Sequence, residues 1–142
     1  MGYRSTVAYT IRFVYHKHPD RDDIEDKKKA EESFYTFIAE AKANEDTAYC
    51  FSEYEGGVFK VDEDNLAINF FAEDVKWYED YSDVKCHEAL ISLSKSWADD
   101  NEYIGGVFAR VGEDLDDMVE ESWGQSDYSW INIARSVCVD WE

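Results

Sequence analysis

Residues 3–15 carry the pattern that most constrains the fold, because apolar and polar side chains alternate along them. Most odd positions are aromatic or β-branched, whereas arginine and threonine occupy most even positions. Successive side chains of a strand point to opposite faces, so this alternation predicts a half-buried strand. Its apolar face consists of Tyr3, Val7, Tyr9, Ile11, Phe13 and Tyr15.

Two longer segments have the spacing of helices. Between residues 23 and 43, apolar residues recur three and four positions apart, and the sequence EDKKKAEE offers ion pairs on the opposite face. A second segment begins near the capping residues Ser82 and Asp83 and ends at Trp97. We therefore expect one long helix in each segment.

Shorter elements complete the predicted order. They are a strand over 47–61 that is broken or turned at Gly56-Gly57, strands over 66–71 and 102–111, a short helix over 113–123, and a strand over 129–141. The resulting order is β-α-β-β-α-β-α-β. It predicts an α+β fold, ferredoxin-like or related, in which two long helices and one short helix pack on a mainly antiparallel sheet. We expect one acidic domain spanning 1–142.

The charge limits the classes of partner. The chain has 33 acidic and 14 basic residues, a net charge of −19. A compact chain of this length is roughly 35 to 40 Å across, and duplex DNA of that length carries on the order of 20 charges. Such a charge opposes direct binding to nucleic acid or to an anionic membrane. The sequence also has no apolar run of a membrane span and no pattern of a secretory signal.

Sequence motifs give no catalytic residue and no cofactor site. The chain has no GxSxG, P-loop, GxGxxG or HExxH motif, although paired carboxylates for acid/base catalysis stay open among so many acids. Cys50, Cys86 and Cys138 do not form a close pair. Their spacing predicts reduced thiols in a cytosolic protein and neither a zinc site nor a disulfide framework.

The histidines are the other candidate metal ligands. His16 and His18 would face the same way on a strand and, with Asp20, could hold an ion. The predicted strand ends here and Pro19 follows, which favours histidines of a surface turn. His87 lies beside the apolar stripe of the second helix, and we expect a satisfied, partly buried side chain.

The stretch 113–121 is the densest acidic segment. Six of its nine residues are carboxylates and none is basic. It does not fit a calcium loop, since the sixth residue counted from Asp114 is Val119 where an EF-hand needs glycine. As a helix it would present its acids on one side, and like charges at this spacing destabilise an isolated helix. The acids then serve either a basic partner or solubility alone.

A second acidic segment, 73–83, mixes carboxylates with aromatic residues. This combination suits recognition of arginine and lysine through ion pairs and cation–π contacts. Alternatively, Trp77 and Tyr81 pack beneath the second helix. The predicted partner-binding residues are Glu73, Asp74, Trp77, Tyr78, Glu79, Asp80, Asp83, Glu113, Asp114, Asp116, Asp117, Glu120 and Glu121.

Three segments, MGYRSTVAY, VKWYEDYSDV and RVGEDLDD, resemble segments of small, acidic, largely uncharacterised proteins of tailed bacteriophages. They cover 27 of the 142 residues. The resemblance provides no catalytic residues to carry over. It implies action in the cytoplasm of an infected bacterium and binding to host proteins that handle nucleic acid, in some cases by imitating the charge of DNA.

Charge and resemblance together lead to one main hypothesis and two alternatives. The main hypothesis is a non-enzymatic phage protein that inhibits or modulates a basic, nucleic-acid-handling host protein. One alternative is a small divalent-metal-dependent enzyme or metal-binding module that uses the carboxylates of 113–121. The other is a structural or assembly protein whose acidity only maintains solubility. The sequence leaves the oligomeric state open.

Overall fold

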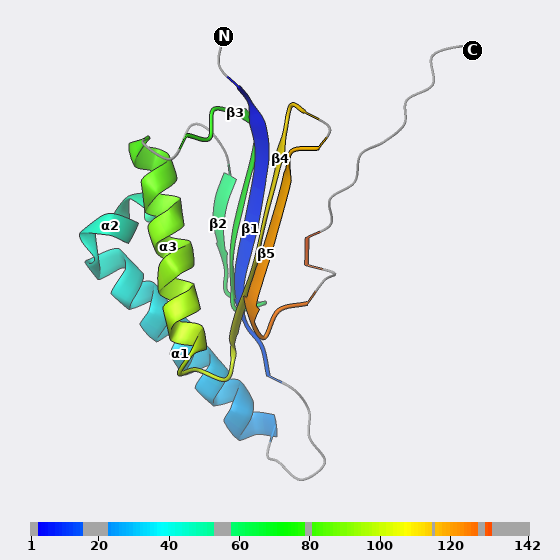
Figure 1. The fold of residues 1–142 in the computed structure, drawn as a ribbon. Helices are drawn as coiled ribbons and strands as arrows, with labels where there is room; N and C mark the ends of the chain where they lie inside the picture. The colour runs from blue at the N-terminus through cyan, green and yellow to red at the C-terminus, as the bar shows by residue number, and fades with distance from the viewer. Residues whose placement is uncertain are drawn as a thin grey trace.

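The computed structural model describes residues 3–15, 23–52, 58–78, 81–114, 116–127 and 130–131 (Figure 1). The strands are β1 (Ser5–Phe13), β2 (Val58–Asp62), β3 (Ala67–Val75), β4 (Ile104–Gly112) and β5 (Met118–Gly124). The helices are α1 (Asp23–Ala43), α2 (Glu45–Ala48), the 3₁₀ turn η1 (Tyr49–Phe51) and α3 (Ser82–Ala98). None of these helices is long and apolar enough to cross a membrane.

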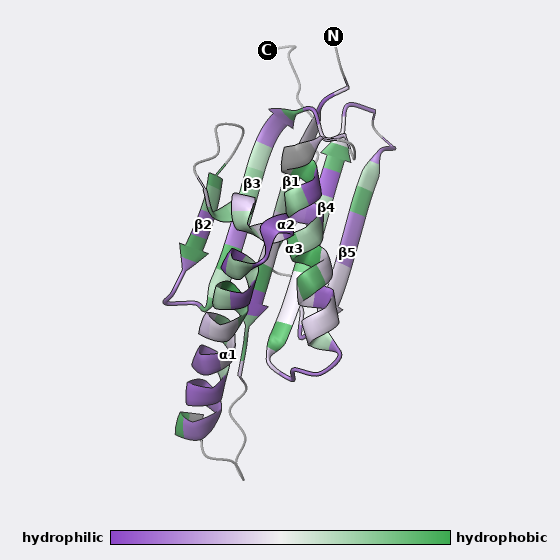
Figure 2. Cartoon of the chain, turned by 90° about the vertical axis from the view of Figure 1, so that its left-hand side faces the viewer, coloured by the Kyte–Doolittle hydropathy of each residue, from purple (hydrophilic) through white to green (hydrophobic). Residues whose placement is uncertain are grey.

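The five strands form one antiparallel sheet in the order β2-β3-β1-β4-β5, with β1 at its centre. Each long helix joins two strands that have a third strand between them: α1 joins β1 to β2, and α3 joins β3 to β4. Figures 1 and 2 show α1 and α3 side by side on the same face of the sheet. The predicted α+β architecture is therefore confirmed.

The hydrophobic core fills the space between this face and the helices. The odd positions of β1 point into it, as the alternation predicts, and the apolar stripes of α1 and α3 cover them. Phe13 illustrates the packing, since its ring contacts Phe34 and Phe37 of α1 and Trp97 of α3. The fully or almost fully buried members include Val7, Tyr9, Ile11, Phe13, Ala30, Phe34, Phe37, Ala41, Ile68, Phe70 and Leu90.

The short helix predicted over 113–123 is wrong, because residues 118–124 form β5 and pair with β4 in a hairpin. The helical prediction rested on the spacing of Leu115, Met118 and Val119, whereas β5 turns Met118 and Val119 to opposite faces. Three contacts favour the strand: the Gly112 amide donates to the Asp117 carbonyl, the Arg110 guanidinium binds the Asp117 carboxylate, and the Trp123 ring lies over Gly106. Cross-strand pairing thus overrides the local spacing.

The strand predicted over 47–61 is wrong in its first part. Asn44 caps a further helical turn by accepting a hydrogen bond from the Asp46 amide, so α2 and η1 occupy residues 45–51. Only Val58–Asp62 forms the predicted strand. The glycine pair lies outside the described residues, as does the strand predicted over 129–141 except for Trp130 and Ile131.

Candidate functional site

The described residues of the two acidic segments meet at one end of the sheet, although residues 84–112 separate the segments in the sequence. Ser5 at the start of β1 pairs with Val75 at the end of β3 and with Gly112 at the end of β4. The central strand therefore brings the last residues of β3 beside the β4–β5 turn. A shallow pocket of about 400 Å³ lies there, lined by Arg4, Ser5, Thr6, Glu73, Asp74, Val111, Gly112 and Glu113.

A bulge in β3 turns two successive carboxylates toward solvent. Val7 pairs with Ala72 while Ser5 pairs with Val75, so Glu73 and Asp74 together face a single residue of β1. Asp74 has a φ of 55°, a left-handed conformation that aspartate tolerates better than most residues. In a regular strand one of two successive side chains would face the core. Here both are exposed, as an insertion of this kind allows.

Arg4 lies between the two acidic segments and contacts both. Its guanidinium donates a hydrogen bond of 2.9 Å to the Asp74 carbonyl, and its Nε lies 3.8 Å from the Asp74 carboxylate. Its backbone amide donates to Glu113 Oε1 at 2.7 Å. These contacts fix the spacing of Asp74 and Glu113, while the charge of the surrounding acids exceeds the single positive charge of Arg4.

Asp117 belongs to the framework of the hairpin. Arg110 holds its carboxylate in a two-pronged pair, with N–O distances of 3.0 and 2.9 Å. The Tyr3 hydroxyl donates to the same carboxylate at 2.6 Å and accepts a hydrogen bond from the Asp114 amide at 3.1 Å. The hydrogen bond to Asp117 is the main reason that the pKa of Tyr3 is raised. Asp117 is thus engaged inside the protein and is a poor contact for a partner.

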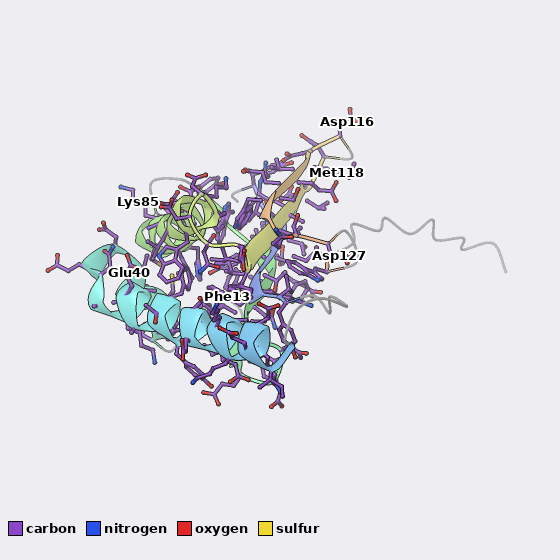
Figure 3. All side chains as sticks on the ribbon, turned by 90° about the horizontal axis from the view of Figure 1, so that it is seen from below. Phe13, Glu40, Lys85, Asp116, Met118 and Asp127 are labelled. Atoms are coloured by element: carbon purple, nitrogen blue, oxygen red, sulfur yellow. The ribbon has the colours of Figure 1, made fainter. Side chains whose placement is uncertain are left out.

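The acids of β5 point to opposite faces, because they are neighbours in a strand. Glu121 faces the helices and forms an ion pair of 2.5 Å with Lys95 of α3. Glu120, paired with Ala109 across the hairpin, faces the side of the sheet without helices and is exposed. Asp116 is exposed at the tip of the hairpin, where Figure 3 shows it far from the helices. Glu120 and Asp116 are therefore the more accessible acids of this segment.

The aromatic residues of the second segment also differ in exposure, because Trp77 packs against the core and Tyr81 is exposed. Trp77 packs against Phe70 and His87 at ring distances of 6.1 and 5.8 Å, so the alternative of a core-packed Trp77 is confirmed. The Tyr78 hydroxyl accepts a hydrogen bond from the Tyr3 amide, and its ring contacts the exposed Tyr81 edge-on. Glu79, Asp80 and the side chain of Asp83 lie outside the described residues.

The metal-binding alternative for 113–121 meets a geometric obstacle. The carboxylates of Asp117 and Glu121 contact Arg110 and Lys95, and Glu113 accepts from the Arg4 amide. Within the described part of the chain, the group of three side chains that could hold an ion lies elsewhere, at Cys50, Cys86 and His87. His16, His18 and Asp20 fall outside that part.

Comparison of the chain with protein-family models, with curated proteins and with solved structures gave no match.

Proposed function

We propose that this protein is an acidic binding protein of a tailed bacteriophage that inhibits or modulates a basic, nucleic-acid-handling host protein in the bacterial cytoplasm. Its binding surface is the acidic end of the sheet, formed by Glu73, Asp74, Glu113, Asp114, Asp116 and Glu120. The observation that carries the proposal is the convergence of two acidic segments at this end, where a bulge exposes two successive carboxylates.

The arrangement of charge supports a partner rich in arginine and lysine. The acids extend from the end of β3 across Arg4 to the tip of the β4–β5 hairpin, and the exposed Tyr81 adds an aromatic face. Ion pairs and cation–π contacts would then act together. With a net charge of −19, electrostatic steering would make association fast and sensitive to salt. A partner whose own ligand is DNA or RNA presents the required positive surface.

The first experiment is capture from a bacterial lysate at low and at high salt, followed by competition. A captured protein is offered duplex DNA with and without the acidic protein. The proposal predicts that capture weakens as salt rises and that the acidic protein displaces DNA from the captured protein. A captured protein that binds DNA equally well in its presence contradicts charge mimicry.

A matched pair of variants tests the surface itself. Asp116→Asn with Glu120→Gln removes two charges from the proposed surface, whereas Asp99→Asn with Asp100→Asn removes two from the exposed α3–β4 connection at the opposite end of the sheet (Figure 1). We expect the first variant to lower the association rate constant at low salt severalfold and the second to leave it nearly unchanged. Equal effects of the two variants would show that only net charge matters.

A further inference from the structure

Two thiols and an imidazole meet in the core at a place unrelated to the acidic surface. Cys50 belongs to η1, and Cys86 and His87 are successive residues of α3. The exposed fractions of these side chains are 2%, 4% and 0%. One ligand atom from each lies within 4.8 Å of the other two. We call these three residues the thiol–imidazole cluster.

The cluster has both a polar neighbour and an apolar enclosure. The Tyr9 hydroxyl of β1 lies 2.6 Å from His87 Nδ1, and Cys50 Sγ lies 3.7 Å from the same nitrogen. The rings of Phe70, Trp77 and Phe59 surround the imidazole at centroid distances of 4.2, 5.8 and 6.1 Å. The hydrogen bond with Cys86, together with burial, raises the pKa of the Cys50 thiol.

We propose that the thiol–imidazole cluster binds one Zn²⁺ ion, or a similar thiophilic divalent ion, through Cys50 Sγ, Cys86 Sγ and His87 Nδ1. Sulfur and nitrogen ligands of a tetrahedral zinc ion are about 3.6 Å apart when the bonds are about 2.3 and 2.05 Å long. The 3.7 Å between Cys50 Sγ and His87 Nδ1 is close to this value.

Charge balance also favours a divalent ion at this depth. Two thiolates and a neutral imidazole carry a charge of −2, which one Zn²⁺ ion cancels, so the occupied site has no net charge. A neutral centre is the arrangement that a buried, apolar environment tolerates. Binding releases the two thiol protons to solvent and forms two metal–sulfur bonds, with no change of oxidation state.

Tyr9 and the covering turn give the site a fourth group and a route of entry. When Nδ1 binds the ion, the Tyr9 hydroxyl beside it can donate a hydrogen bond to a thiolate or approach the fourth coordination position. Cys50 lies in a single 3₁₀ turn at the surface, between the exposed Tyr49 and the half-buried Phe51. Opening this turn exposes Cys50, and the bound ion would hold η1 against α3.

The test is titration of the full chain with Co²⁺ and then Zn²⁺ in the presence of a phosphine reductant that keeps the thiols reduced. Tetrahedral Co²⁺ with thiolate ligands gives visible bands and a sulfur-to-metal charge-transfer band. We expect one equivalent of Co²⁺ to produce both, and one equivalent of Zn²⁺ to abolish them and to raise the melting temperature. This readout uses the unaltered protein, so it does not depend on whether a variant folds.

Variants then assign the ligands. Cys50→Ala and Cys86→Ala should each lose the charge-transfer band, with circular dichroism confirming that the fold persists. Cys138→Ala, and His16→Gln with His18→Gln, should retain the band, because those residues are not ligands in the proposal. The proposal is overturned if the wild-type protein shows no charge-transfer band, if Cys138→Ala abolishes it, or if folded Cys50→Ala and Cys86→Ala both retain it.

Discussion

Asp117 is the residue at which the strand and the helix interpretations of 113–123 make opposite predictions. In the structure its carboxylate binds Arg110 through two N–O contacts and the Tyr3 hydroxyl through a third. In a helix, the same carboxylate would stand three and four positions from Asp114, Glu113, Glu120 and Glu121. Removing its charge would then relieve repulsion and stabilise the protein slightly.

The expected loss of unfolding free energy on removal of the Asp117 carboxylate depends on how exposed the Arg110–Asp117 ion pair is. The side chains of Arg110 and Asp117 are 22% and 28% exposed, so solvent screens the interaction only in part. Hydrogen bonds to charged groups contribute about 1.5–3 kcal/mol when buried, whereas exposed ion pairs contribute about 0–1 kcal/mol. Between these limits, we expect Asp117→Ala to lower the free energy of unfolding by about 2 kcal/mol. The exposed neighbour supplies the control, since Asp116→Ala should change it by less than about 0.5 kcal/mol.

Urea unfolding followed by tryptophan fluorescence measures both variants, and a double-mutant cycle with Arg110→Ala isolates the pair. The cycle should give a favourable coupling of about 1 kcal/mol or more between Arg110 and Asp117. A stabilising Asp117→Ala, or a coupling indistinguishable from zero, would refute the hairpin register and return 113–123 to a helical interpretation.

Three further predictions concern the sheet and its core. Gly106→Ala should destabilise the hairpin by about 1–3 kcal/mol and alter the tryptophan emission, because a Cβ there overlaps the Trp123 ring; unchanged emission would contradict that contact. Leu90→Ala, at a fully buried site of α3, should cost about 2–5 kcal/mol in urea unfolding, and a loss below about 1 kcal/mol would show that the core collapses around it. Burial, followed by the neighbouring Glu102 and Asp26, raises the pKa of Tyr103 from 10.0 to about 12. The protonated Tyr103 therefore contributes its full share to the free energy of unfolding below pH 10, and this contribution should be lost as the pH rises to about 12. Tyr103→Phe should lack this fall, and parallel curves of unfolding free energy against pH for the two proteins would argue against it.

Among the correctly predicted elements, β1, α1 and α3 have the clearest sequence pattern because each buries one face. In β1, α1 and α3, most apolar positions recur with the period of their own element and lie in the core, with Ile24 and Tyr35 of α1 as exposed exceptions. The segment 113–124 lacks such a pattern, because an edge strand buries little. Val119 and Trp123 pack against the core, whereas Met118 is exposed. This segment forms a strand because it pairs with β4, and the spacing of residues within the segment does not predict that pairing.

The two sites differ in how far the sequence could reveal them. Both acidic segments are visible as composition, but their convergence depends on the position of β1 between β3 and β4. The bulge at Glu73 and Asp74 also appears only in the pairing register. The thiol–imidazole cluster joins residues 37 positions apart, so a search for closely spaced cysteines does not find it. The sequence predicts a partly buried His87, whereas the structure buries it fully.

The position of β5 at the edge of the sheet gives its acids a physical role that needs no partner. An edge strand exposes unpaired backbone groups, and charged side chains on it oppose pairing with another sheet. Glu120 is suited to this role, and so are Glu73 and Asp74, because β2 pairs with β3 only as far as Phe71. Edge protection alone implies that neutralising these acids leads to self-association. Partner binding implies instead that such a variant stays in its original oligomeric state and loses capture. The first effect is a change of oligomeric state and the second is a loss of binding. Measuring the oligomeric state of the Asp116→Asn, Glu120→Gln variant therefore distinguishes an acidic surface that recognises a partner from one that only prevents self-association.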